Sequence, residues 1–136
     1  MKRLLTALAL IIAANFVSAQ DMQPGLWEIT TKTQMQGMSI PGMTFSYCYT
    51  EQDLATGKQF SNKDSGDCQI SNMKSAGGNI SYDMNCDADG VKMAGLVKGK
   101  FTANTYELEQ KITMTPDQGM GEMHMDVKGR RLGKCK

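Results

Sequence analysis

The stretch that decides the fold is CQISNMKSAGGNISYDMNC, residues 68–86. Its centre, Ala-Gly-Gly at 76–78, is a turn signal, and residue types alternate along both flanks as in half-buried strands. A hairpin folded at this turn sets Cys68 directly opposite Cys86, at a Cβ separation of about 4.5–5.5 Å that a twisted hairpin can close to a disulfide. The sequence therefore predicts two antiparallel strands held by a Cys68–Cys86 bond. The same register pairs Ile70 with Met84 and Asn72 with Tyr82.

The first nineteen residues have the pattern of a secretory signal peptide. Lys2 and Arg3 give a basic start, an apolar run follows from residue 4 to residue 17, and Val17-Ser18-Ala19 supplies the small residues that a signal peptidase reads. We expect cleavage after Ala19, a periplasmic location and a single β-rich domain over residues 20–136. No later apolar run reaches the roughly 18 residues that a membrane span needs, so we expect no membrane span.

The remaining two cysteines indicate a second disulfide. The chain has four cysteines, at positions 48, 68, 86 and 135, and an even count in an exported chain indicates two disulfides. A Cys68–Cys86 bond leaves Cys48 to pair with Cys135 and to tie the C-terminus to an earlier strand. Zinc is the competing interpretation, but no two cysteines lie within the C-x₂₋₄-C spacing of a zinc knuckle.

The charge of the chain is close to neutral. The formal net charge is +1, and removal of Lys2 and Arg3 with the leader lowers it to −1. A near-neutral chain lacks the electrostatic footprint of a protein that binds nucleic acid or an anionic membrane surface. We therefore expect no nucleic-acid partner.

Alternation with a period of two predicts further strands on both sides of the hairpin. In QPGLWEITTKTQMQ, residues 23–36, the side chains of Trp27, Ile29 and Met35 fall on one face. A loop rich in Gly and Pro is expected at residues 37–43. A short helix near 51–57 would follow, with Thr50 as its N-cap. The other expected strands are 44–50, 91–101, 106–115 and about 122–131, with polar loops at 61–67, 87–90 and 116–121.

Charged residues indicate how the later strands pair. A turn at residues 102–105 sets Lys100 opposite Glu107 and Lys98 opposite Glu109. Between the last two strands, opposite charges meet on the outer face if the pairs are Glu107–Arg130, Glu109–Lys128 and Lys111–Asp126. This register also predicts the inner pairs Ile112–Met125 and Met114–Met123. A one-residue slip would turn the charged ladder inward, so the pattern indicates which face is exposed.

These elements predict an all-β fold, an antiparallel meander of about seven strands with one short helix and two disulfides. One face of the sheet is apolar and the other is charged. The apolar face must be covered, either by curling into a partial barrel or by folding over as a sandwich. Gly95, Gly99 and Gly129 on the inner face favour strong curvature.

Several stretches in order resemble a known family. They are PGLWE at 24–28, MQGMSIPGM at 35–43, CYTEQDL at 48–54, the cysteines at 68 and 86, and GRRLGKC at 129–135. The set resembles the bacterial exported family catalogued as domain of unknown function 3617, over nearly all of the mature chain. The resemblance implies a small periplasmic domain and carries no known activity, so no catalytic or binding residues can be transferred from it.

Two groups of methionines are candidates for a copper site, because Cu(I) prefers thioether and imidazole ligands. Core packing is the alternative, since methionine fills irregular gaps well. If 122–131 is a strand, Met123 and Met125 point to the core and His124 to the charged face, so these three could not close around one ion. A frayed strand start, or Met120 joining the 35–43 loop, would allow the site. The first group is Met120, Met123, His124 and Met125, and the second is Met35, Met38 and Met43.

His124, the only histidine, is the one candidate for histidine-based catalysis. Asp126 shares its face, and Thr113 is expected across from it, which gives the outline of a Thr-His-Asp relay. A flat solvated face offers neither a pocket nor an oxyanion hole, so we expect a solvated histidine and no enzyme activity. Arg130 is expected to pair with Glu107, while Arg131 reaches a carboxylate or backbone carbonyls and helps to lock the C-terminus.

Aromatic residues could line a cavity for an apolar ligand, namely Trp27, Phe45, Tyr47 and Tyr82. Core packing is again the alternative. The leading hypothesis is a non-enzymatic exported binding domain that needs no cofactor and whose partner is an apolar small ligand or an envelope protein. A periplasmic Cu(I) or Ag(I) binder that uses methionines is the second hypothesis.

Overall fold

The computed structural model describes residues 22–56, 67–117 and 119–136. The expected leader, the expected helix end at Gly57 and residues 61–66 of the expected polar loop lie outside the described residues. The elements in chain order are β1 (Gly25–Met35), β2 (Met38–Tyr49), α1 (Glu51–Ala55), β3 (Asp67–Ala76), β4 (Asn79–Ala88), β5 (Val91–Phe101), β6 (Thr105–Thr115) and β7 (Met123–Gly133).

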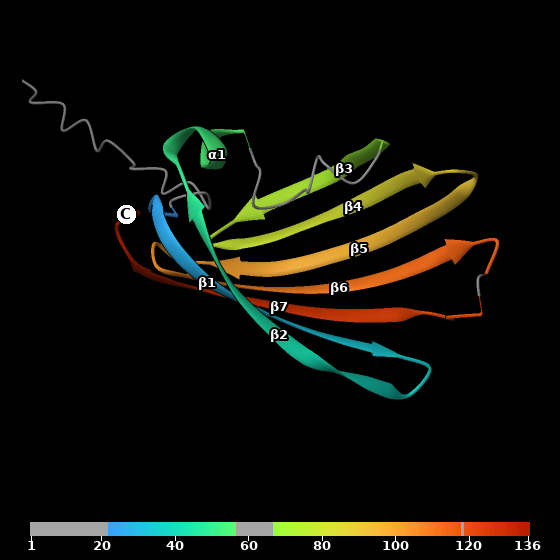
Figure 1. Ribbon diagram of the computed structural model, residues 1–136. Helices are drawn as coiled ribbons and strands as arrows, with labels where there is room; N and C mark the ends of the chain where they lie inside the picture. The colour runs from blue at the N-terminus through green and yellow to red at the C-terminus, as the bar shows by residue number, and fades with distance from the viewer. Residues whose placement is uncertain (1–21, 57–66, 118) are drawn as a thin grey trace, which may run out of the picture.

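All seven strands lie in a single antiparallel sheet, which confirms the predicted all-β fold. The strand order is β2-β1-β7-β6-β5-β4-β3, so that β7 returns to pair with β1 and the edges are β2 and β3. The predicted meander is therefore correct from β3 to β7 and wrong at β2 and β3, which follow each other in the chain but are not neighbours in the sheet. The sheet curls strongly, and α1 lies on its concave side at one end (Figure 1). Of the two predicted ways to cover the apolar face, the curled sheet is therefore the observed one.

Three tight turns set the hairpins. Each has two central residues with positive φ, as a type I′ turn requires: Gln36 and Gly37 (47° and 76°), Gly77 and Gly78 (58° and 80°), and Asp89 and Gly90 (52° and 83°). The twist of these turns matches that of the strands that they join. These turns join β1 to β2, β3 to β4 and β4 to β5 as continuous hairpins.

The predicted loop at 37–43 is wrong, because β2 begins directly after the first of these turns. Thr31 pairs with Met43 and Thr33 with Ile40, so Pro41 and Gly42 together face the single residue Lys32. This is a β-bulge, which accommodates the extra residue within the strand. Proline is tolerated because β2 is an edge strand, where a backbone N–H can be dispensed with.

The hairpin of β3 and β4 has the predicted register at its disulfide end. Cys68 pairs with Cys86 and Ile70 with Met84, as expected. The predicted regular pair of Asn72 with Tyr82 is replaced by a bulge in which Asn72 and Met73 together face Tyr82, because the register shifts by one residue between Ser71 and Lys74. Asn72 adopts a left-handed φ of 51°, and its amide donates a hydrogen bond to Asp83 Oδ2 at 2.6 Å, which holds the bulge.

The predicted register of β6 and β7 is wrong by two residues. The five predicted pairs Glu107–Arg130, Glu109–Lys128, Lys111–Asp126, Ile112–Met125 and Met114–Met123 do not form. Instead Glu107 pairs with Lys128, Glu109 with Asp126, Lys111 with His124 and Ile112 with Met123. A shift of two preserves which face each residue uses. The pairs Lys98–Glu109 and Lys100–Glu107 between β5 and β6 are confirmed.

Packing on the inner face explains the observed register. Tyr106 pairs with Gly129, and its ring lies where a side chain at position 129 would stand. In the same way Leu108 lies over Gly99. Exposed charge pairs are worth only about 0.2–1 kcal/mol each, whereas a displaced aromatic side chain leaves a cavity that costs more. The glycines therefore decide the pairing, and the charges adapt to it.

The helix α1 closes one end of the curl. Thr50 is its N-cap as predicted, with a capping box: Asp53 N–H donates to Thr50 Oγ1 at 3.1 Å, and Thr50 N–H donates to Asp53 Oδ2 at 3.0 Å. Leu54 is the buried residue of the helix and joins the core. The helix ends at Ala55, two residues before the predicted end, with Thr56 as its C-cap.

The core lies on the inner face at the α1 end. Trp27 is fully buried, and its ring centroid lies 5.6 Å from that of Tyr106 and 6.3 Å from that of Tyr49. The Trp27 indole donates to the carbonyl of Gln23 at 3.1 Å, so its polar atom is satisfied. The other fully buried large side chain is Val97.

Gly129→Ala should destabilise the protein by about 1–3 kcal/mol, because the new Cβ would overlap the Tyr106 ring. Gly95→Ala is the matched control: its Cβ would lie 3.4 Å from Met84 and 3.8 Å from Ile112, which are ordinary contacts. Urea unfolding measures both variants. Equal stability of the two would show that the Tyr106–Gly129 contact does not set the register.

The predicted Cys48–Cys135 bond is also confirmed, with a Cα–Cα distance of 5.7 Å, and it ties the end of β2 to the C-terminus. It closes a loop of 87 residues, against 18 for Cys68–Cys86. Cys48→Ala with Cys135→Ala should therefore cost about 4.5 kcal/mol, and Cys68→Ala with Cys86→Ala about 3 kcal/mol. Urea unfolding of the two double variants checks the order, and the reverse order would contradict this entropic account.

Candidate functional site

Within the part of the chain that the structure describes, the inner face of the sheet has a half covered by α1 and an uncovered half, which we call the open half. At the α1 end, Leu54 and Met22 are buried against the strand residues of the core. At the opposite end, which carries the β1–β2 turn and the β6–β7 connection, no described helix or strand lies over the face (Figure 1). Most side chains there are half-buried or exposed, whereas Ile112 and Cys86 are buried.

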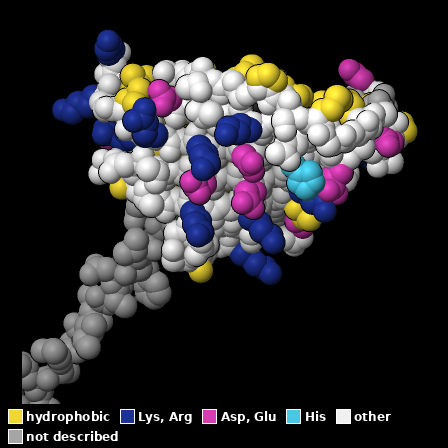
Figure 2. All heavy atoms as spheres, turned by 90° about the horizontal axis from the view of Figure 1, so that it is seen from below, with side chains coloured by type: hydrophobic (Ala, Val, Ile, Leu, Met, Phe, Trp, Pro, Cys, Tyr) yellow, Lys and Arg dark blue, Asp and Glu magenta, His cyan; other side chains and the backbone are white. Residues whose placement is uncertain are grey.

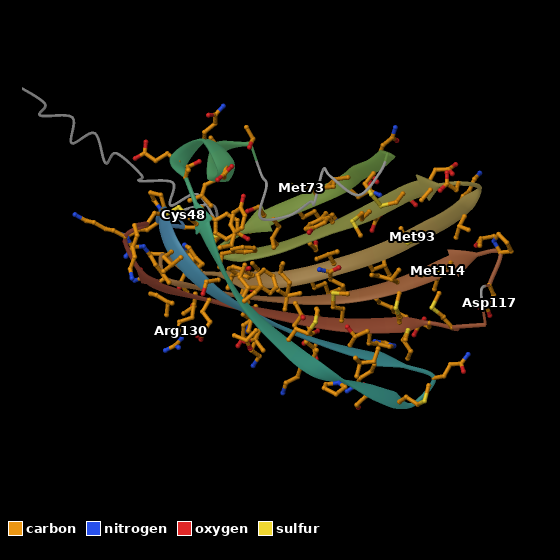
Figure 3. All side chains as sticks on the ribbon, viewed as in Figure 1. Cys48, Met73, Met93, Met114, Asp117 and Arg130 are labelled. Carbon is orange, nitrogen blue, oxygen red and sulfur yellow. A yellow bond between two sulfur atoms is a disulfide. The ribbon has the colours of Figure 1, made fainter. Side chains whose placement is uncertain are left out.

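The open half is lined by methionines from most of the strands. The registers align Met38, Met35 and Met123 in one transverse row that continues through Ile112 to Met84. Met93 and Met114 face each other on the neighbouring strands β5 and β6, beside the Cys68–Cys86 disulfide (Figure 3). We call this surface the methionine face; its residues are Met35, Met38, Met84, Met93, Ile112, Met114, Met123 and Met125.

The residues of the predicted ligand cavity divide between the two halves. Trp27 and Tyr82 are 0% and 3% exposed and belong to the core. Tyr47 is half-buried and packs against that core, with its ring centroid 4.7 Å from that of Tyr49. Phe45 is 48% exposed on the edge strand β2. Of this set, Phe45 is thus the most accessible to a ligand.

The two predicted methionine groups meet only in part. Met35 pairs directly with both Met38 and Met123, which joins members of both groups. The Gln36 amide donates a hydrogen bond to the carbonyl of Gly119, so the 119–121 loop that carries Met120 touches the β1–β2 turn. Met125 lies one row further along, opposite Thr33, and Met43 lies beyond the bulge, opposite Thr31.

His124 lies on the outer, charged face, as predicted for a continuous strand. Its Nε2 is 2.8 Å from Glu122 Oε1, and the other oxygen of Glu122 is 3.0 Å from Lys111 Nζ (Figure 2). The hydrogen bond from Lys111, followed by that from His124, lowers the pKa of Glu122. The expectation that Thr113 lies across from His124 is wrong, because Lys111 occupies that position after the two-residue shift of register.

The two arginines hold strands together. Arg130 donates to Glu28 Oε1 at 2.7 Å across the β1–β7 pair, while Glu107 pairs with Lys128 at 3.3 Å. The predicted Glu107–Arg130 ion pair is therefore replaced by these two. Arg131 Nε donates to the carbonyl of Pro24 at 3.0 Å, as expected for contact with a backbone carbonyl, and fixes the start of β1.

A hollow of about 640 Å³ lies on the outer face, over the ends of β3 to β6. Its charged lining residues are Lys74, Lys98, Lys100, Glu107 and Glu109. Lysines and glutamates stand opposite each other in the β5–β6 register, so the hollow has mixed charge. It therefore lacks the single-sign field of an anion site.

Within the described ranges, no group of three or more His, Cys, Asp or Glu side chains could hold a metal ion. All four cysteines are in disulfides. Any metal bound by the described residues would therefore need other ligands, and the thioethers of the methionine face are the soft ligands at hand.

Met84, Met93 and Met114 were not among the candidate site residues predicted from the sequence; all three are half-buried on the inner face, and Met84 packs against the core. Alternation correctly placed them on the inner face. The missing information was the extent of the cover, because the helix has only five residues and lies at one end.

Comparison with known proteins gives a family but no activity. A family model described as a protein of unknown function (DUF3617) matches residues 22–135. An uncharacterised protein of Pseudomonas putida, named for its position in the lpd-3 5′ region, is 50% identical over 42 residues, or 30% of each chain. The match thus spans less than a third of that relative's length. No solved structure matches the chain. Among the described residues, no helix is long and apolar enough to cross a membrane.

Alkaline pH should destabilise the fold through its buried tyrosines. Burial raises the pKa of Tyr82 from 10.0 to about 12, and burial also raises the pKa of Tyr106. Between pH 10 and about pH 12, the phenol of Tyr82 loses its proton in the unfolded chain but keeps it in the folded protein. The contribution of this phenol to stability is therefore full below about pH 10 and falls as the pH rises. Tyr82 alone should remove about 1.4 kcal/mol per pH unit in this window.

Urea unfolding across this window, together with the near-ultraviolet absorbance of phenolate, measures the effect. Tyr82→Phe should reduce the alkaline slope of the unfolding free energy, because the buried phenol is then absent. A Tyr82 that titrates at the ordinary phenol pKa in the folded protein would contradict its burial.

Proposed function

The chain belongs to DUF3617, a family of proteins of unknown function that matches residues 22–135, and we propose that it is a non-enzymatic binding domain for an elongated apolar small molecule. The ligand would lie on the methionine face, across the strands. The observation that carries this proposal is the open half of the inner face, where apolar side chains from neighbouring strands stand unburied.

The exposed apolar surface extends from the methionine face onto the edge strand. Met38, Ile40, Met43 and Phe45 of β2 are 65%, 43%, 67% and 48% exposed. Contiguous apolar surface of this kind usually marks a site of interaction in a soluble protein. The curl of the sheet makes the face concave, which favours a small ligand over a flat protein partner (Figure 1).

The side chains suit a ligand that is apolar and variable in shape. Methionine is unbranched and polarisable, so a surface lined with it can adapt to different apolar groups. The polar residues interspersed on this part of the inner face are Thr33 and Gln110, and neither is ionisable. His124 and the charged ladder lie on the opposite face, away from a bound ligand. These features support ligand binding without catalysis.

The compartment that we propose is the periplasm. Disulfides form and persist in oxidising compartments, and both of the disulfides described here support a location outside the cytoplasm. The basic, apolar and small-residue pattern of residues 1–19 supports export by a signal peptide.

The neutral fluorescent probe N-phenyl-1-naphthylamine tests this function. We expect saturable binding by the protein, with a Kd on the order of micromolar, because an apolar probe leaves water on the methionine face. Met93→Gln with Met114→Gln should weaken binding about tenfold, since burying amides against the probe is unfavourable. Fluorescence titration measures both proteins.

Leu96→Gln is the matched control, because Leu96 is 55% exposed and lies on the outer face of β5. It should leave probe binding unchanged. Non-saturable fluorescence, or an equal loss in this control, would reject the site. Native mass spectrometry of protein purified from the periplasm adds a second measurement: a bound lipid-sized mass supports the proposal, and a stoichiometric polypeptide in its place would favour an envelope protein partner.

A further inference from the structure

We propose that Met35, Met38 and Met123 form a three-thioether site for a soft monovalent cation, Cu(I) or Ag(I). The three residues belong to three adjacent strands, β2, β1 and β7, at the open end of the inner face. The site is a second property of the methionine face, and it does not depend on the binding of an apolar molecule.

The strand registers bring the three side chains together. Met35 lies in the middle strand, directly opposite Met38 on one side and directly opposite Met123 on the other. Directly opposed residues of antiparallel strands share a face, with Cβ atoms about 4.5–5.5 Å apart. Each methionine has three rotatable bonds beyond its backbone, so the sulfurs of the outer two can converge above the central one.

The turn next to this row fixes its geometry. Met35 and Met38 flank the two-residue turn at Gln36 and Gly37, whose positive φ values give a tight hairpin. Gln36 also bonds to the carbonyl of Gly119, which attaches the β6–β7 connection to the turn and therefore steadies the approach to Met123. The half-buried Met120 is carried by the same connection and is available as a fourth thioether.

The surroundings select for a soft ion. Charged and imidazole groups nearby, namely Lys111, Glu122 and His124, pair with one another on the outer face. The cysteines form disulfides and supply no thiolate. A site of thioethers alone prefers Cu(I) or Ag(I) over Zn²⁺, Mg²⁺ or Ca²⁺, which need nitrogen, thiolate or oxygen ligands.

Exposure allows an ion to enter. Met38 is 65% exposed, while Met35 and Met123 are half-buried. One side chain can therefore move to admit the ion, and the other two are held by their neighbours. The ordinary alternative, that these methionines merely fill the core, fits Met38 poorly because most of its surface is in contact with water.

Titration of the mature, disulfide-bonded protein with Cu(I) in competition with bicinchoninate tests the site. Ascorbate keeps the copper reduced without the thiol reagents that would cleave the disulfides, and Ag⁺ titrated by calorimetry gives an independent measurement. We expect one ion per protein with a Kd below about 1 µM. Changing all three residues, as Met35→Leu, Met38→Leu and Met123→Leu together, should weaken binding about 100-fold.

Three comparisons make the result specific. The control triple Met43→Leu, Met93→Leu and Met114→Leu removes as many inner-face thioethers and should leave the affinity within about threefold. His124→Ala should have no effect, because the imidazole lies on the other face. Met38→Leu alone, at a position that is 65% exposed, should weaken binding about tenfold even if the triple variant folds poorly.

Several outcomes would overturn the site: a Kd no tighter than micromolar, equal losses in the two triple variants, or a loss in His124→Ala. Failure here is distinguishable from failure of the proposed apolar binding. Leucine remains apolar, so the Met35, Met38 and Met123 variant should still bind N-phenyl-1-naphthylamine when it no longer binds the metal.

Discussion

The contact of the Tyr106 ring with the backbone at Gly129 is the constraint on which the rest of the structure depends. It sets the register of β6 against β7, and through β7 it positions β1, because the same strand carries both pairings. The ring also contacts Trp27 and Phe101, so the contact joins the sheet register to the centre of the core. Glycine at this position lets the backbone bend toward the ring, which contributes to the curl of the sheet.

The same packing divides the inner face into two regions with different roles. Aromatic side chains fill the end beside α1, where the helix and Met22 complete the core. Methionines line the opposite end, where the described chain places no covering element. A flexible thioether tolerates partial exposure and irregular contacts better than a rigid aromatic ring does. The change of residue type along the strands thus follows the change from core to accessible surface.

Much of this fold could be predicted from the sequence, because period-two alternation reports directly which face a residue uses. The Cys68–Cys86 pairing followed from one glycine turn, and the capping box at Thr50 followed from local spacing. The β6–β7 register could not be predicted from the charges, since a shift of two residues keeps every side chain on its face. The position of the Tyr106 ring decided the β6–β7 register, and its contact with Gly129 joins residues 23 positions apart through tertiary packing.

For the candidate site, the sequence indicated the methionines, but Met123 was grouped with His124, its neighbour in the chain. The register shows that its partner in space is Met35.

Strand β2 combines two features that bear on whether copies of the protein associate edge to edge. Its twelve residues contain no charge, and it is an edge strand of the described sheet, where a row of backbone donors and acceptors invites pairing with another molecule. Pro41 removes one donor, and the bulge beside it breaks the even spacing of the others. Continuous sheet growth from one molecule to the next is thereby interrupted at the middle of the strand. Pro41 and the bulge therefore act as gatekeepers against polymerisation through β2, a strand that has no charged side chain to block such pairing.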